Sequence, residues 1–219
     1  MMNAGFIVTK EHRRFTEFAN AVRKERTIGI CHGDAGVGKT NSARRYANWD
    51  VLEPYINEWG PRGDHDAKHY ALANRSRTVF YTPEVLCRPK TLMNEIDHWQ
   101  IKVGICADEH LRSLHPAPPT SRGVTHLVEL LIIDEAERLT PTALELLRDR
   151  HDREHLAMIL IGMPGIDQRF RHYPSSTAAS ASPTATAPSA AMNSSSSSTA
   201  IGNISAGHST RTTSPTPKP

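Results

Sequence analysis

The stretch Gly33-Asp34-Ala35-Gly36-Val37-Gly38-Lys39-Thr40 decides how this sequence is interpreted, because it fits the pattern G-x-x-x-x-G-K-[ST] at every fixed position. The glycines let the backbone curl so that successive N–H groups point at one anion, and the positive end of the following helix faces the same point. We therefore expect residues Gly33 to Asn41 to cradle the phosphates of a nucleotide. Lys39 is expected to reach the β- and γ-phosphates as a catalytic residue, and the Thr40 hydroxyl to ligate Mg²⁺.

A second motif supplies the carboxylates that such a loop needs. The run Leu130-Leu131-Ile132-Ile133-Asp134-Glu135 is a continuous apolar segment ending in two acids, which is typical of a strand buried on both faces. Asp134 is expected to hold the magnesium ion through its water shell, and Glu135 to polarise the attacking water as a catalytic residue. Together the two motifs predict a P-loop NTPase that binds ATP before GTP.

Apolar strand patterns alternate with helical patterns along most of the chain. Strands are expected at 27–32, 77–82, 127–134 and 156–162, and helices at 10–24, at 38–48, around 92–99 and from 140 onward. Such alternation indicates an α/β three-layer fold with a parallel sheet and helices on both faces. The polar stretches 51–76 and 107–125, rich in turn residues, are expected to be loops.

The first 26 residues are expected to form a basic amphipathic helical region. Thr9 can cap a helix whose apolar face carries Phe15, Phe18 and Val22, while arginine and lysine side chains occupy the rest of it. A solvated face is the ordinary role of such a surface, and contact with DNA phosphates is the alternative.

Composition divides the chain near residue 174. All 23 acidic residues precede residue 172, and residues 175–219 contain mainly Ser, Thr, Ala, Pro and Gly, with no Leu, Val, Phe or Trp. A segment of this kind buries too little apolar surface to offset its ordering entropy, so we expect residues 175–219 to be disordered and residues 27–174 to form the core.

Several features favour a protein of the reducing cytoplasm. The three cysteines are widely spaced and form no C-x-x-C pair. The chain contains no apolar run of membrane-spanning length, and its first ten residues lack a signal-peptide pattern. We expect no membrane partner.

Several segments together resemble the AAA+ ATPases of DNA transposition, the TniB-like and Mu B-like helper proteins. Beyond the two motifs above, the resemblance rests on residues 7–15, 42–46, 79–83 and 160–165, and it covers roughly residues 6–174. It implies an ATP- and Mg²⁺-dependent protein that binds double-stranded DNA, forms a homo-oligomer when full length and recruits a transposase. Gly162 and Met163 stand where such proteins usually place a polar residue that senses the γ-phosphate.

The chain departs from that family after Pro174, and a shifted reading frame explains the departure. Codons can be chosen for residues 175–188 that, with one C restored before them, read Q-L-Y-S-R-V-G-F-A-H-R-Y-R-P, which is the continuation expected of the family. We therefore expect residues 175–219 to be out of frame, the fifth strand, the helical lid and the S-R-V arginine to be missing, and ATP hydrolysis to be near background. Sequencing the gene around codon 175 tests this hypothesis.

Two other functions share the same core motifs. One is a nucleotide-gated binding module that recruits a partner without turnover, and the other is a STAND- or ORC-like ATPase of signalling or replication. ATP-dependent, salt-sensitive binding to arbitrary duplex DNA distinguishes the transposition helper from the signalling ATPase.

Overall fold

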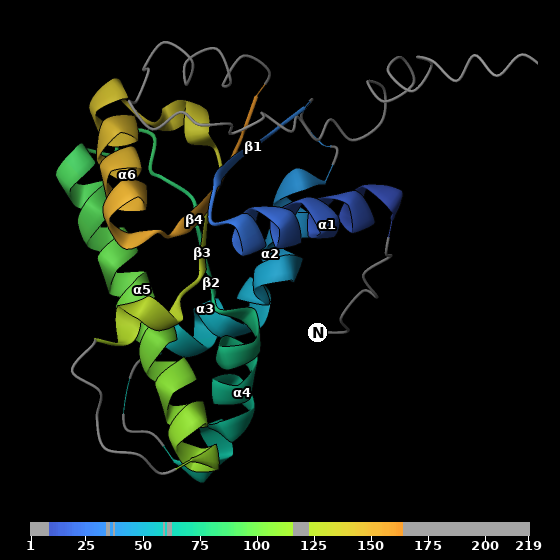
Figure 1. Cartoon of the computed structure of the whole chain (residues 1–219), viewed down its shortest axis with the longest axis vertical. Helices are drawn as coiled ribbons and strands as arrows, with labels where there is room; N and C mark the ends of the chain where they lie inside the picture. Colours follow the sequence, from blue (N-terminus) through green and yellow to red (C-terminus); the bar gives the residue numbers. More distant parts are fainter. Residues whose placement is uncertain are drawn as a thin grey trace, which may run out of the picture. The chain divides into compact units, whose positions relative to one another are not determined.

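The computed structural model describes residues 9–33, 36, 38–58, 60, 63–115 and 123–163, without the side chain of Asp64. All of these residues belong to one compact unit, Met1–Ser189. Within it, parallel strands form a four-stranded sheet in the order β1-β4-β3-β2, so that β1 and β2 lie at its two edges (Figure 1). The strands are β1 (Ile28–His32), β2 (Thr78–Tyr81), β3 (Leu130–Ile133) and β4 (Ala157–Gly162).

Helices cover both faces of this sheet. The helices are α1 (Lys10–Glu25), α2 (Lys39–Ala47), α3 (Trp49–Asn57), α4 (Ala67–Ser76), α5 (Pro89–Leu114) and α6 (Pro141–Glu154). In Figure 1, α1 and α2 lie on one side of the strands, and α5 and α6 lie on the other. The three-layer α/β architecture expected from the alternating patterns is therefore confirmed.

Two segments expected to be loops contain helices instead. The stretch 51–76 holds most of α3, the short 3-10 turn η1 (Asp64–Asp66) and α4. Leu52 and Ile56, four residues apart on one face of α3, are completely buried, so burial decides the structure of a segment whose composition is polar. Within 107–125, α5 continues to Leu114 and the 3-10 turn η2 covers Val124–Leu127, whereas residues 116–122 lie outside the described parts.

Local capping signals fix where α1 and α6 begin. The Thr9 hydroxyl accepts a hydrogen bond from the backbone N–H of His12 at 3.1 Å. The Thr140 hydroxyl accepts from the N–H of Ala143 at 3.2 Å, and Pro141 occupies the first turn of α6. Each threonine satisfies a helix N–H that has no partner within the helix, so both predicted starts are confirmed.

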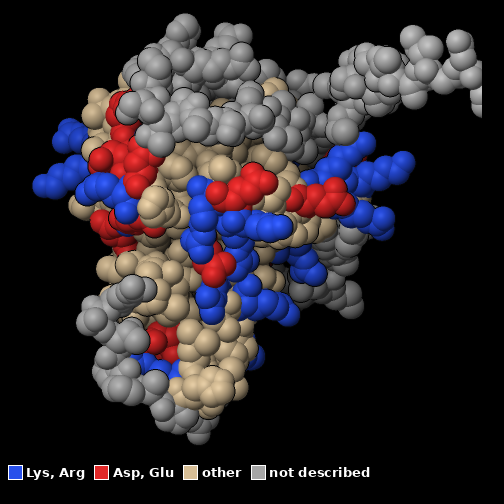
Figure 2. All heavy atoms as spheres, in the orientation of Figure 1, with Lys and Arg blue, Asp and Glu red and all other residues tan. Residues whose placement is uncertain are grey.

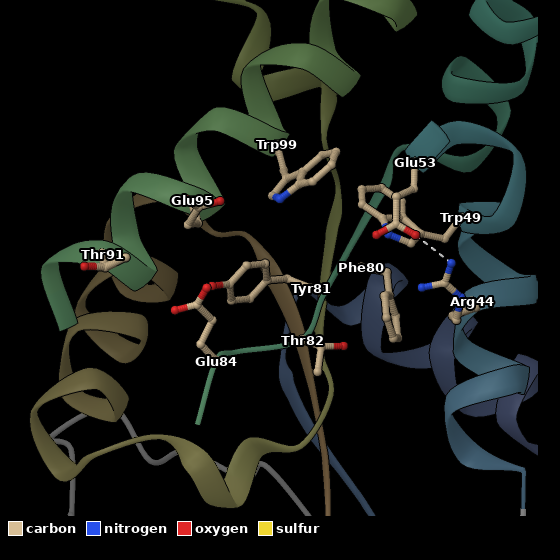
Figure 3. A pocket seen from close by; sticks show the side chains of 10 residues that line it. All are labelled: Arg44, Trp49, Glu53, Phe80, Tyr81, Thr82, Glu84, Thr91, Glu95 and Trp99. Carbon is tan, nitrogen blue, oxygen red and sulfur yellow. Dashed lines mark hydrogen bonds and ion pairs between the residues drawn. The ribbon is translucent and has the colours of Figure 1, made fainter. Parts of the chain in front are cut away.

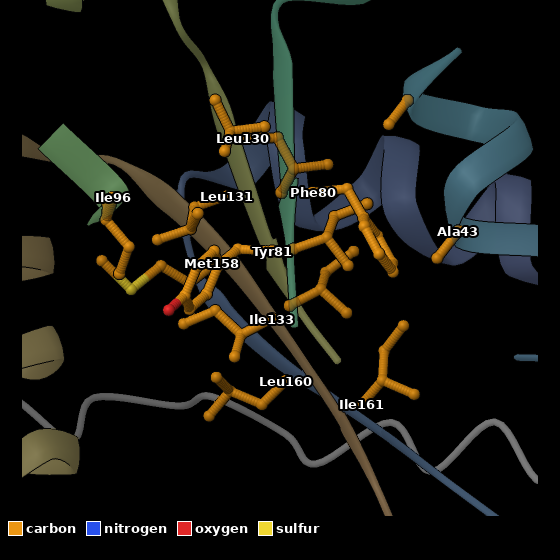
Figure 4. Close-up of a cluster of buried hydrophobic side chains, with 14 of the residues drawn as sticks. Ala43, Phe80, Tyr81, Ile96, Leu130, Leu131, Ile133, Met158, Leu160 and Ile161 are labelled. Carbon is orange, nitrogen blue, oxygen red and sulfur yellow. The ribbon is translucent and has the colours of Figure 1, made fainter. Parts of the chain in front are cut away.

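The core consists of two apolar layers, one on each side of the sheet. All residues of β2, β3 and β4 are buried. Figure 4 shows Met158 and Leu160 on the side of Ile96 from α5, and Phe80 and Ile161 on the side of Ala43 from α2. This alternation explains why the strands are apolar runs rather than alternating patterns, since both faces are covered by helices.

The close approach of α1 to the sheet depends on Gly29 in β1. A Cβ atom at this position would lie 2.6 Å from both Phe18 Cζ and Val22 Cγ2. The missing side chain therefore lets the apolar face of α1 rest directly on β1.

Residues 164–219, which include the segment expected to be disordered and out of frame, lie outside the described parts. Among the helices described between residues 10 and 154, none combines the length and the apolar character needed to cross a membrane.

Candidate functional site

The two sequence motifs meet at the carboxyl edge of the sheet. The Thr40 hydroxyl Oγ1, at the start of α2, donates a hydrogen bond to Oδ2 of Asp134, directly after β3, at 2.7 Å. Asp134 is 4% exposed, and its backbone N–H donates to the Tyr81 carbonyl at the end of β2 at 2.9 Å. The contact arises because parallel strands end at the same edge of a sheet.

The described part of the loop after β1 requires glycine for its shape. Gly36 has φ = 81° and Gly38 has φ = 83°, the left-handed region that side chains disfavour. Gly38 is also the N-cap of α2, so its conformation turns the chain directly into that helix. Of the other predicted phosphate-binding residues, Asp34, Ala35 and Val37 lie outside the described residues.

Lys39 folds back across this loop. Its ammonium Nζ donates a hydrogen bond to the carbonyl oxygen of Gly33 at 2.6 Å. A lysine held in this way has its charge over the loop that the sequence assigns to phosphate. The geometry places a positive group beside the left-handed glycines and the N-terminus of α2, all of which favour an anion.

A cavity of about 230 Å³ opens between the two loops. Its walls carry Gly36, Gly38, Lys39, Thr40, Asn41, Asp134, Glu135, Glu137, Gly162 and Met163. All the predicted site residues in this list therefore share one cavity, and Gly162 and Met163 line it from the end of β4. Glu137 was not among the predicted residues, because its position two residues beyond the acidic pair matches no motif.

Glu135 occupies a strained position at the rim. It adopts a left-handed conformation with φ = 50°, and its carboxylate lies 3.5 Å from the guanidinium of Arg138. Partial burial, and then the hydrogen bond and negative charge of Glu137, raise the pKa of Glu135 above its ordinary value, and Arg138 opposes this shift. A raised pKa makes a carboxylate a stronger base at neutral pH.

Cys31 lies beneath the phosphate loop without contributing a reactive group. Burial raises the pKa of its thiol to about 11, Lys39 lowers it and Asp134 raises it further. Its side chain is 1% exposed. A neutral, enclosed thiol packs as a small apolar residue.

The oxygen atoms at the centre of this site suit a magnesium ion. Thr40 offers a hydroxyl and Asp134 a carboxylate, and Mg²⁺ binds oxygen ligands and retains several waters. The two side chains already lie within hydrogen-bond distance of each other, so they are close enough to serve one hydrated ion. The donor set therefore fits the metal that the sequence predicts.

Comparison with known proteins supports the same interpretation. Residues 22–170 match the sequence profile of the family described as "AAA domain". A Staphylococcus aureus protein named "Potential ATP-binding protein" is 36% identical over 180 residues, which are 78% of this chain and 64% of that protein. The chain thus spans less than two thirds of the length of this relative. Fold, cavity and profile agree, and this chain is an ATP-binding, AAA-type P-loop protein that belongs to the AAA domain family.

Proposed function

We propose that the cavity between the loop after β1 and the end of β3 binds ATP together with Mg²⁺. The observation that carries this proposal is the 2.7 Å contact between Thr40 and Asp134 at the mouth of a loop with two left-handed glycines. Lys39 would neutralise phosphate charge, and backbone N–H groups from Gly36 to Asn41 would donate to phosphate oxygens. Thr40 and Asp134 would hold the metal, which supplies charge neutralisation at the phosphates.

Lys39→Ala tests the binding site. Removing the ammonium should weaken the binding of a fluorescent ATP analogue by at least about tenfold, the size of one lost charge-assisted contact. Lys68→Ala removes an equivalent charge from the exposed surface of α4 and should leave binding unchanged. Equal affinities of the two variants would contradict the assignment.

We further propose that Glu135 is the base in ATP hydrolysis. The carboxylate lines the cavity and its pKa is raised, as a base that accepts a proton from water at neutral pH requires. Because turnover is expected to be slow, a single-turnover assay with protein in excess over labelled ATP is the suitable measurement. Glu135→Gln should slow it by about 10²-fold or more, whereas Glu109→Gln, on the exposed surface of α5, should not. Turnover unaffected by Glu135→Gln would favour a nucleotide-gated binding module instead.

The proposed partner is double-stranded DNA, with a transposase recruited to it by an ATP-dependent oligomer. Support comes from the surface of α1, where Lys10, Arg13, Lys24 and the adjacent Arg26 are exposed. Figure 2 shows Lys and Arg side chains gathered over the region that α1 and α2 occupy in Figure 1, with acidic side chains between them. A surface of this kind attracts phosphate backbones without reading sequence.

ATP-dependent DNA binding tests this role. The double substitution Arg13→Gln and Arg14→Gln should weaken binding to any duplex and reduce the dependence of affinity on salt by up to about two phosphate contacts. Lys68→Gln combined with Lys90→Gln changes the net charge equally on α4 and α5 and serves as the control. If ATP-loaded protein binds no duplex DNA, a STAND- or ORC-like signalling ATPase becomes the better interpretation.

A further inference from the structure

A second cavity, of about 270 Å³, lies at the outer edge of β2, on the opposite side of the sheet order from β1. Residues of α2, α3, β2, the segment after β2 and α5 surround it (Figure 3). The wall residues are Arg44, Trp49, Glu53, Phe80, Tyr81, Thr82, Glu84, Thr91, Glu95 and Trp99. None of them lines the proposed nucleotide cavity.

The inner half of this cavity already holds a cation. The guanidinium carbon of Arg44 lies 5.4 Å from the centre of the Phe80 ring. Its Nε donates to Asp50 at 2.7 Å, and its Nη2 donates to Glu53 at 2.6 Å. An aromatic face combined with carboxylates stabilises a guanidinium, and the two acids neutralise Arg44, so the cavity offers no site for an anion.

The outer half repeats the same chemistry. The Tyr81 ring and the Trp99 indole are flanked by the carboxylates of Glu84 and Glu95, as Figure 3 shows. Both acids are exposed, and neither forms an ion pair with any residue of the described ranges. Burial, then Cys87, Glu95 and Glu84, raise the pKa of the Tyr81 phenol, which places both negative charges around that ring.

The rim of the cavity adds an apolar surface. Val85 and Leu86 follow Glu84 directly and are 73% and 91% exposed. A free amine or guanidine gains nothing from such neighbours, whereas a polypeptide can place apolar side chains on them while its cation enters the cavity.

We propose that the cavity at the β2 edge binds the cationic side chain, arginine or lysine, of a partner polypeptide whose adjacent residues are apolar. Tyr81 and Trp99 would provide the aromatic faces, and Glu84 and Glu95 the compensating charge. The proposal is independent of the nucleotide site, because the two cavities share no residue.

Blocked pentapeptides test this proposal on the full 219-residue chain. The probes are acetyl-Gly-Leu-Arg-Leu-Gly-amide and the same peptide with citrulline, the neutral isostere of arginine. Binding is followed by the indole N–H resonances of Trp49 and Trp99. The arginine peptide should shift both resonances, and the citrulline peptide should bind at least about tenfold more weakly.

Protein variants provide the matched comparison. Glu84→Gln combined with Glu95→Gln should weaken the arginine peptide about tenfold, whereas Glu109→Gln, also an exposed acid of α5, should have no effect. ATP binding by the double variant should match the unsubstituted chain, which shows that the variant is folded and separates this test from that of the nucleotide site.

Three results would overturn the proposal. Equal affinity for the arginine and citrulline peptides would show that the cavity does not select a cation. Agmatine binding as tightly as the peptide would identify a small molecule, rather than a polypeptide, as the occupant. Peptide binding that competes with concentration-dependent self-association in sedimentation experiments would identify a second copy of this chain.

Discussion

Thr40 and Asp134 stand 94 positions apart in the sequence, yet their side chains are joined by a hydrogen bond of 2.7 Å. The strands that lead to them, β1 and β3, flank β4 in the sheet. All three are parallel, so the loop after β1 and the acid after β3 emerge at one edge. The contact combines two separate sequence motifs into one candidate metal site.

Asp134→Asn should remove the effect of magnesium on nucleotide affinity. The amide keeps the shape of the carboxylate but loses its charge, so Mg²⁺ should improve ATP binding by about 10–100-fold less than in the unsubstituted chain. Titrations of a fluorescent ATP analogue with and without Mg²⁺ measure this. Asp149→Asn, an exposed acid of α6, is the control, and an unchanged magnesium effect in Asp134→Asn would contradict the metal assignment.

Gly29→Ala should destabilise the fold by about 1–3 kcal/mol, because the new methyl group meets Phe18 and Val22 at 2.6 Å. Urea unfolding followed by circular dichroism measures the loss. Gly60→Ala serves as the comparison, since the only atom near a Cβ there is the Glu58 carbonyl oxygen at 3.8 Å, and it should change stability by less than about 0.5 kcal/mol. Similar stability of the two variants would show that α1 does not rest on β1 as described.

Glu129→Gln should lower stability at neutral pH and lose this effect in acid. Glu129 accepts from Arg23 Nε at 2.6 Å and from Arg77 Nη1 at 3.1 Å, which ties α1 to the starts of β2 and β3. Burial by itself raises the pKa of Glu129, but the hydrogen bonds and charges of Arg23 and then Arg77 outweigh it, and the net pKa is lowered below 4.5.

A lowered folded-state pKa stabilises the fold above the ordinary pKa and loses that contribution as pH falls through the folded value. The unfolding free energies of the two proteins should therefore differ by about 1 kcal/mol at pH 7, a small value because the three side chains are partly exposed. The difference should shrink below about pH 4.5. A difference that stays constant with pH would show that packing, rather than charge, carries the effect.

The Cys31 thiol should make the native chain less stable in strong base. Its pKa is raised from 9.0 to about 11, so the neutral thiol stabilises the fold below pH 9 and that contribution disappears as pH rises through 11. Between pH 9 and 11, unfolding free energy should fall more steeply in the unsubstituted chain than in Cys31→Ala. Iodoacetamide should also label Cys31 far more slowly in the native chain than in urea, and equal rates would contradict its burial.

The position of each strand was predictable because the relevant signals are local. An apolar run that ends in Asp134 and Glu135, and one that leads directly into Gly33, remain recognisable without any partner. Thr9 and Thr140 fixed the starts of α1 and α6 because a capping hydroxyl acts on an N–H only three residues away. Residues 51–76 were misjudged because α3 and α4 are helices through burial of residues such as Leu52 and Ile56, and burial depends on distant neighbours.

The sequence by itself therefore determined the phosphate loop, the acidic strand end and the parallel α/β class, since each follows from residue type and spacing. Only the tertiary structure decided that Thr40 and Asp134 share one cavity and that Glu137 lines it. It alone brought Arg44, Tyr81 and Trp99 from three different elements to the edge of β2. The physical reason is that sheet order and helix packing bring together side chains far apart in the chain, and no local pattern records that order.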